Sequence, residues 1–166
     1  AQKDIGERIS NIVLMGIGEP LDNFDNVMDF LTIISCPDGV NIGMRNISLS
    51  TCGIVPMIDR LAEKKLQLTL SISLHAPNDE MRSKMMPVND AYPVAQLIAA
   101  CRRYQQTTGR RVSFEYSMVR GVNDSPATAR ELASLIRGMG AHVNLIPINP
   151  VDGSPYSATD AENVKR

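Results

Sequence analysis

The sequence lacks three features that would point to particular classes of protein: clustered cysteines, an excess of charge of one sign and long apolar runs. No apolar run approaches the ~18 residues that a membrane-spanning helix requires, so we expect no membrane partner. The first ten residues are polar and unlike a signal peptide, which predicts a cytoplasmic protein. The net charge is −1, so the chain shows no basic excess of the kind that phosphate-binding domains usually carry.

The three cysteines, Cys36, Cys52 and Cys101, are scattered, and no C-x-x-C or related ligand spacing is present. We therefore predict no metal site within this chain, and burial is the expected role of each cysteine. The sequence also has no low-complexity linker, and it has no internal repeat beyond an alternation of strand-like and helix-like runs.

A length of 166 residues is enough for one domain with a hydrophobic core, and we interpret residues 1–166 as a single domain. The ends look different from the middle. Residues 1–10 show no core-like pattern, and the last ten, SATDAENVKR, resemble a helix that is cut off partway. We therefore expect the chain to be a piece of a longer protein.

Five strand-like runs alternate with helix-like runs. Strands are predicted at residues 11–15, 46–50, 68–74, 112–119 and 142–148. Helices are predicted at residues 26–34, 56–65, from about 77, 93–107, 126–137 and from about 160. Strict alternation of this kind predicts an α/β fold with parallel strands joined by right-handed crossovers. Either a barrel or an open doubly wound sheet satisfies it.

The third strand has one apolar and one polar face. The apolar face carries Leu68, Leu70, Ile72 and Leu74, and the polar face carries Thr69, Ser71, Ser73 and His75. The second and fourth strands repeat the pattern. An antiparallel sheet with one solvated face gives the same alternation, but parallel sheets usually have both faces covered and apolar. We favour a barrel whose interior is hollow and holds water or a ligand.

Polar groups and glycines mark the carboxyl ends of the strands, where parallel α/β folds place their sites. Glu19, after the turn Gly16-x-Gly18, can accept hydrogen bonds from an ammonium group. Ser50 can donate to a carboxylate, and Asn149 can bind an adenine edge or a ribose hydroxyl. These residues suit a zwitterionic ligand that also carries a sugar and a base.

Plainer interpretations apply to several of these residues. The Gly16-x-Gly18 pair is not a dinucleotide fingerprint, because the third position falls on Leu21. His75 is either a general base or a histidine bonded to the backbone at a strand end. We interpret Glu115 and His142 as structural. The basic pairs at residues 102–103 and 110–111 are potential RNA contacts, but solvated helix ends are the favoured interpretation.

Five segments, taken in order, resemble one known family. They are MGIGEPLDN, ISLSTCGIVP, SISLHAPNDEMR, FEYSMVRGVND and NLIPINPVDGSPY. The chain resembles the adenosine-C2 methyltransferases of large-subunit ribosomal RNA, which are radical S-adenosylmethionine enzymes closely similar to the adenosine-C8 methyltransferases of antibiotic resistance. The resemblance implies a partial (β/α)6 barrel, TIM-like and with parallel strands, of which about five strands are present here.

The resemblance also implies a cofactor site. Gly18 and Glu19 would receive the α-amino group of S-adenosylmethionine. The family's other binding positions fall on Ser50, Ser73, Leu74, His75 and Asn149. The implied partners are large-subunit ribosomal RNA and an external electron donor, and some family members also modify transfer RNA. The likeness favours C2 over C8 as the methylated carbon.

The departures from the family concern its reactive parts. Its C-x-x-x-C-x-x-C motif, which holds a [4Fe-4S] cluster, lies upstream of the Gly-Glu segment, together with a small RNA-binding region. Its catalytic cysteine lies downstream of Arg166. The resemblance thus implies no catalytic and no metal-binding residue within this chain, and we expect the isolated chain to be inactive.

Two other hypotheses remain open. The chain could belong to a small-molecule barrel enzyme that uses Glu19, His75 or Glu115 for acid–base chemistry and needs no cluster. It could also be a non-catalytic fragment that binds a nucleoside or nothing. A cysteine triad just upstream of Ala1 would admit only the methyltransferase.

Overall fold

The computed structural model describes residue 4 and residues 6–149 and 152–165. The strands are β1 (Ile12–Leu14), β2 (Ile47–Thr51), β3 (Thr69–Ser73), β4 (Val112–Met118) and β5 (His142–Pro147). The helices are α2 (Phe24–Ser35), α3 (Val55–Glu63), α4 (Asp79–Met85), α5 (Val94–Thr108), α6 (Pro126–Leu135) and α7 (Ala161–Lys165), with short 3-10 turns at η1 (Met44–Asn46) and η2 (Pro87–Asp90). The predicted alternation is confirmed.

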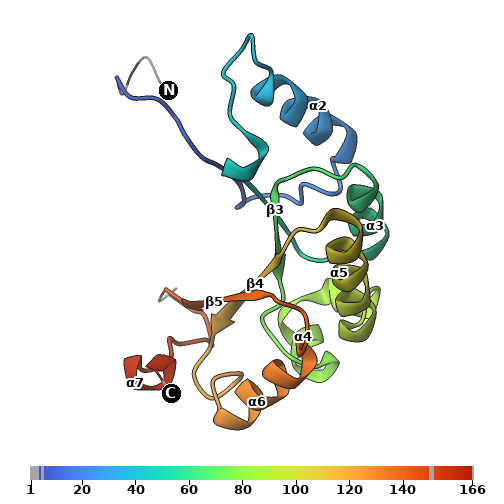
Figure 1. Cartoon of the computed structure of the whole chain (residues 1–166). Coiled ribbons are helices and arrows are strands. Elements are labelled where there is room, and N and C mark those ends of the chain that lie inside the picture. Colours follow the sequence, from blue (N-terminus) through green and yellow to red (C-terminus); the bar gives the residue numbers. More distant parts are fainter. Residues whose placement is uncertain (1–3, 5, 150–151, 166) are drawn as a thin grey trace.

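The five strands form one parallel sheet in chain order, β1-β2-β3-β4-β5. Helices α2, α3 and α5 all lie on the same side of this sheet, and the strands turn progressively from β1 to β5 (Figure 1). The arrangement is that of a partial α/β barrel with a convex, helix-covered face and a concave face. Among the described residues, the sheet does not close on itself.

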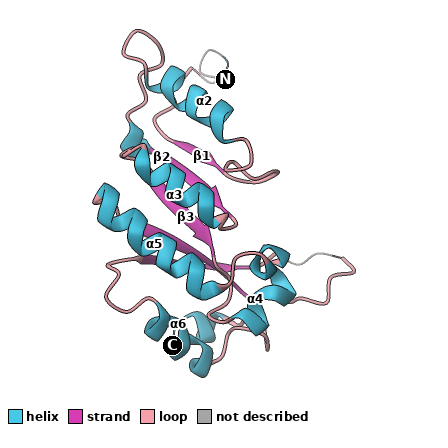
Figure 2. Cartoon of the chain, turned by 90° about the vertical axis from the view of Figure 1, so that its right-hand side faces the viewer, coloured by secondary structure: helices cyan, strands magenta, loops and turns pink. Residues whose placement is uncertain are grey.

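The convex face of the sheet is the hydrophobic core. Leu68, Leu70, Ile72 and Leu74 are all 0% exposed, and α3 and α5 lie across this part of the sheet (Figure 2). Each such side chain contributes roughly 1.5–3 kcal/mol through burial. The predicted apolar face of the third strand is therefore the face that holds the helices.

Local signals in the sequence set the helix ends. The side chain of Asn78 accepts a hydrogen bond from the amide of Met81 at 3.0 Å, which caps the start of α4. Ser125 caps α6 in the same way through the amide of Thr128 at 3.1 Å. Gly109 ends α5 with a φ of 66°, a left-handed conformation that glycine adopts without strain.

The concave face carries rows of small polar residues that match across the strands. One row contains Ser50, Ser71, Ser113 and His142, and the next contains Ser73, Glu115 and Asn144. The Ser48 and Ser71 hydroxyls lie 3.2 Å apart. Asn144 Nδ2 donates to Glu115 Oε2 at 2.7 Å. The polar groups on this face therefore have partners or face the space in front of the sheet.

Within the described residues, no helix combines the length and the apolar character needed to cross a membrane.

Candidate functional site

A cavity of about 340 Å³ opens at the carboxyl ends of the strands. We call it the rim cavity. Its lining comes from the turn after β1 and from all four strands that follow: Met15, Gly16, Gly18, Glu19, Pro20, Ser50, Thr51, Cys52, Ser73, His75, Glu115 and Ile146. Its volume lies in the range of small-molecule sites, roughly 300–1,000 Å³.

The Glu19 carboxylate is fixed by the backbone on both sides. The amide of Leu21 donates to Oε1 at 3.0 Å, and the amide of Cys52 donates to Oε2 at 2.7 Å. The turn that delivers Glu19 needs positive φ at Gly16 (110°) and Gly18 (94°), which favours glycine at both positions. Among the described residues, no cationic side chain pairs with Glu19. A half-buried, oriented carboxylate thus faces the cavity with lone pairs available.

Two serine hydroxyls at the strand ends complete one wall. Ser50 lies near the end of β2 and Ser73 at the end of β3, and both line the cavity. Neither hydroxyl has a hydrogen-bond partner in the described part of the chain. Each is therefore free to donate to, or accept from, a ligand.

His75 follows β3 in a left-handed backbone conformation, with a φ of 58°. A side chain other than glycine pays about 1–2 kcal/mol in this conformation. The His75 Nδ1 atom accepts a hydrogen bond from the amide of Ser117 at 3.0 Å. Burial lowers the pKa of His75 and the Arg82 charge lowers it further, while Glu115 acts in the opposite direction. Of the two interpretations of His75 given above, this hydrogen bond supports the histidine bonded to backbone at a strand end.

Arg82 is a buried residue of the site that the sequence analysis missed. Its side chain is 0% exposed although it belongs to the short helix α4. Its guanidinium donates to the carbonyls of Cys52 (2.6 Å), Ser73 (3.1 Å) and Leu74 (3.1 Å), and to Oδ1 of Asn89 (3.1 Å). It thereby ties the carboxyl ends of β2 and β3 together behind the rim cavity. No periodicity marks such a residue, because its partners are backbone atoms.

The structure brings five of the seven predicted binding residues together at the cavity: Gly18, Glu19, Ser50, Ser73 and His75. Leu74 and Asn149 are not among the lining residues. The Leu74 side chain is buried in the core on the convex face, so only its backbone is near the rim. Asn149 is exposed beyond the end of β5.

Of the two residues interpreted as structural, Glu115 lines the rim cavity and His142 lies at the opposite end of the sheet. The Ser113 hydroxyl donates to Glu115 Oε1 at 3.2 Å, so both carboxylate oxygens have partners on the sheet. These bonds support the structural interpretation of Glu115.

The described residues contain no group of three or more cysteine, histidine or carboxylate side chains that could hold a metal ion. Burial and the neighbouring Glu19 carboxylate raise the pKa of the Cys52 thiol to about 12, and burial raises that of Cys101 to about 12. Both are therefore protonated thiols at neutral pH, and neither belongs to a group of potential metal ligands in the described part of the chain. These residues do not fit an iron–sulfur cluster.

The basic pairs are largely engaged in holding the helices in place. Arg103 binds Asp59 through two hydrogen bonds of 2.9 and 2.7 Å. Arg102 donates to the carbonyl of Leu135, the last residue of α6, at 3.3 Å and to that of Arg137, just after the helix, at 3.2 Å. Arg110 contacts the carbonyl of Leu68 at 3.5 Å. These contacts support structural roles for the three arginines.

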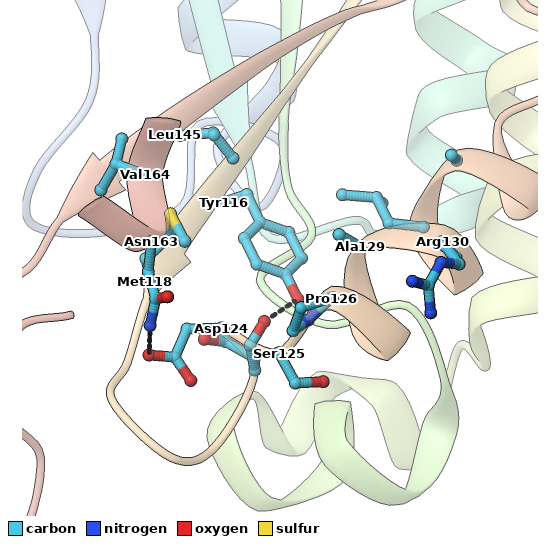
Figure 3. A pocket seen from close by; sticks show the side chains of 13 residues that line it. Tyr116, Met118, Asp124, Ser125, Pro126, Ala129, Arg130, Leu145, Asn163 and Val164 are labelled. Atoms are coloured by element: carbon cyan, nitrogen blue, oxygen red, sulfur yellow. Dashed lines mark hydrogen bonds between the residues drawn. The ribbon is translucent and has the colours of Figure 1, made fainter. Parts of the chain in front are cut away.

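A second cavity, of about 360 Å³, lies between β4, β5, α6 and α7 (Figure 3). Tyr116, Leu145 and Val164 contribute apolar surface to it. The Tyr116 hydroxyl donates to the carbonyl of Asn123 at 3.0 Å, and Asn163 contacts Asp124 at 3.4 Å. These bonds anchor the loop that joins β4 to α6.

Comparisons with known proteins match both the sequence and the fold. The profile of the radical SAM superfamily matches residues 1–133. A probable dual-specificity RNA methyltransferase RlmN of Clostridium novyi is 53% identical over 165 residues, which is 99% of this chain and 48% of the relative. A protein of the same name from Desulforudis audaxviator is 54% identical over 160 residues, 96% of this chain and 50% of the relative. The chain spans about half the length of the curated relatives it matches.

Solved structures agree. A radical SAM methyltransferase from Sphaerobacter thermophilus matches with a TM-score of 0.94 at 50% identity, over 98% of this chain and 48% of that one. A domain of pyruvate-formate lyase-activating enzyme from Bacteroides vulgatus matches with a TM-score of 0.69 over 95% of this chain and 89% of that one. The second match, at 16% identity, supports the fold alone. The chain belongs to the radical SAM superfamily.

Proposed function

We propose that this chain is the S-adenosylmethionine-binding core of a radical SAM methyltransferase that methylates C2 of an adenine in large-subunit ribosomal RNA. Transfer RNA is the second proposed substrate. The relatives are named dual-specificity RNA methyltransferases, and this supports two kinds of RNA substrate. A cytoplasmic setting stays a prediction.

One observation carries the proposal: the Glu19 carboxylate faces the rim cavity, is oriented by two backbone amides and has no cationic partner in the described residues. An oriented carboxylate of this kind favours an ammonium group in the ligand, because a charge-assisted hydrogen bond then replaces water. S-adenosylmethionine carries such a group on its amino-acid half.

The rest of the rim cavity suits the remainder of the same molecule. The free hydroxyls of Ser50 and Ser73 can bind its carboxylate or its ribose hydroxyls. Gly18 leaves the backbone open to close approach, since no side chain covers it. When bound, S-adenosylmethionine supplies the methyl group and the radical chemistry, and the residues of this chain bind it, orient it and exclude water.

The remaining parts of the enzyme are proposed to lie outside the described residues. These parts are the cluster-binding segment, the amino-terminal RNA-binding region and the carboxyl-terminal catalytic cysteine. The cysteines described here do not fit the cluster, so no step of the reaction is assigned to them. The external electron donor would act on that cluster.

Glu19→Gln in the full-length protein tests the proposal. The substitution keeps the shape of the side chain but removes its charge, so the bond to the ammonium group weakens by about 1.5–3 kcal/mol. We expect calorimetry to show a correspondingly higher Kd for S-adenosylmethionine. The matched control is Glu63→Gln, which makes the same change at an exposed residue at the end of α3 and should leave the Kd unchanged. An unchanged Kd in Glu19→Gln would remove Glu19 from the site.

A further inference from the structure

His75 combines a strained backbone with a place in the rim cavity. Three non-glycine residues in the described chain have positive φ: Asn41, Lys65 and His75. Of these, only His75 lines the rim cavity. A strained conformation persists where the surrounding structure over-determines it, and such residues gather at ligand sites. The contacts that impose this conformation therefore bear on what His75 does.

The side chain of Asn123 is the main contact that holds the His75 backbone. Asn123 is 2% exposed and lies in the loop between β4 and α6. Its Nδ2 atom donates to the carbonyls of His75 and Ser117, both at 2.7 Å, and its Oδ1 atom accepts from the amide of Val119 at 2.7 Å. Both N–H groups and the oxygen of this amide are thus used to join the end of β3 to the end of β4.

The Asn123 backbone is itself anchored. The Tyr116 hydroxyl donates to the carbonyl of Asn123 at 3.0 Å, next to the second cavity (Figure 3). Asp124, the next residue, accepts a hydrogen bond from Thr159 at 2.6 Å. Hydrogen bonds therefore fix both the Asn123 backbone and the residue that follows it, so the Asn123 side chain can hold His75 in a fixed position.

The ring of His75 has a defined tautomer. Because Nδ1 accepts the amide hydrogen of Ser117, a neutral imidazole must carry its own proton on Nε2. Burial lowers the pKa of His75, the Arg82 charge lowers it further, and the Glu115 charge raises it with a smaller effect. In the described part of the chain, Nε2 has no hydrogen-bond partner. The free N–H belongs to a ring that lines the rim cavity.

We propose that Asn123 is a positioning residue that holds His75 so that its Nε2–H projects into the rim cavity as a fixed, uncharged donor to the nucleoside half of the ligand. The inference rests on the proposed function, because it takes S-adenosylmethionine as the ligand. A neutral donor suits the ring nitrogens of adenine and the oxygens of ribose, which are neutral acceptors. Glu19 would bind the ammonium group on the amino-acid half of the same ligand.

The first test measures the tautomer by ¹⁵N NMR of the histidine rings in the full-length protein. His75→Gln removes the His75 signals and so assigns them. We expect a protonated Nε2, a bare Nδ1 and a titration midpoint below the ordinary 6.5, because the pKa is lowered. A proton on Nδ1 at neutral pH would overturn the inference, and this measurement needs no variant of Asn123.

Variants of Asn123 then test whether its side chain positions His75. Asn123→Asp keeps the acceptor for Val119 but loses the two donors, and Asn123→Ser removes both functions. We expect the single tautomer of His75 to give way to a mixture in each folded variant. Asn163→Ala is the matched control, since Asn163 contacts the same loop through Asp124 but does not contact His75. An unchanged tautomer in a folded Asn123 variant would contradict the positioning role.

The ligand contact is tested with half-ligands added at millimolar concentration to the full-length protein. 5′-Methylthioadenosine carries the nucleoside half and should shift the Nε2 resonance of His75. Methionine should shift the amide of Cys52, next to Glu19, and leave Nε2 unchanged. If methionine alone produces shifts, the inference fails and the proposed function stands. If neither compound shifts either signal, the proposed function fails and the inference fails with it.

Affinity gives an independent measure in the full-length protein. His75→Leu removes the donor and should weaken S-adenosylmethionine binding roughly 2- to 10-fold, the effect of one neutral hydrogen bond. His75→Gln keeps an N–H donor in a similar position under the same backbone strain, so it should recover most of that loss. Equal Kd values for the two variants would contradict a donor role.

Discussion

The two faces of the same sheet are stabilised in different ways. On the convex face, β3 packs Leu70 and Ile72 under the helices, and both are 0% exposed. At the concave rim, Glu19 and His75 are instead held by individual hydrogen bonds, each with a particular donor or acceptor. The convex face needs only apolar residues of suitable size, whereas each position at the rim needs a particular atom.

The difference shows how the rim cavity is built. Two buried polar side chains, Arg82 and Asn123, use backbone carbonyls at strand ends as their partners. Through those carbonyls they fix where the backbone leaves the sheet. The positions of Glu19 and His75, which line the rim cavity, then follow from the backbone path and from hydrogen bonds with single amide groups.

The largest expected effect is on the free energy of unfolding, and it compares one residue on each face of β3. Leu70→Ala empties a fully buried position and should lower the free energy of unfolding by about 2–5 kcal/mol. Ser71→Ala, the next residue on the concave face, loses one hydroxyl contact of 3.2 Å to Ser48 and should lower it by about 1 kcal/mol or less. Urea unfolding followed by circular dichroism measures both. Equal losses would show that the concave face is packed like the core.

The next prediction concerns Arg82, which should affect the stability of the fold less than Leu70 does but should also affect ligand binding at the rim. Arg82→Lys keeps the charge, but an ammonium group cannot reach four acceptors arranged around a planar fork. We expect a loss of roughly 2 kcal/mol in the free energy of unfolding, since buried carbonyls lose their donor. The Kd of the full-length protein for S-adenosylmethionine should rise because Cys52 no longer holds Glu19 in place.

Arg60→Lys is the matched control, because Arg60 is an exposed arginine on the convex side with a single carboxylate partner, Asp25. It should change both quantities little, within ~0.5 kcal/mol for the unfolding free energy. A comparable loss of affinity in both variants would show that Arg82 acts through general stability and not through the rim.

Sequence patterns predicted the convex face well because packing has a period. Alternation placed Leu68, Leu70, Ile72 and Leu74 on one side of the third strand, and the structure confirms it. Turn and cap residues located the helix ends within a few residues. The strand-end argument also placed Glu19 and Ser50 at the edge where the carboxyl ends of parallel strands meet, and both line the rim cavity, whereas Asn149 does not.

The rim supports were not predicted, because side chain to backbone bonds have no sequence period. Arg82 has the charge of a surface residue on a short helix, yet it is completely buried by carbonyl partners. Asn123 stands in a loop where asparagine ordinarily signals only a turn. The left-handed backbone of His75 is likewise invisible in a sequence, since glycine is the usual marker of that conformation.

The smallest effect is expected on the outer surface of the convex layer, where Arg103 of α5 binds Asp59 of α3 through two hydrogen bonds. Both side chains are substantially exposed, so water and salt replace the interaction at little cost. Asp59→Asn and Arg103→Gln, alone and together, should leave the urea midpoint within the error of the measurement at 0.5 M salt, a concentration chosen because it screens exposed charges to roughly a 4 Å range. A clear loss in each single variant that is equally large in the double variant would mean that the helix layer depends on a paired polar contact, as the rim does. The contrast between the two faces would then hold for the sheet alone and not for the helices that cover it.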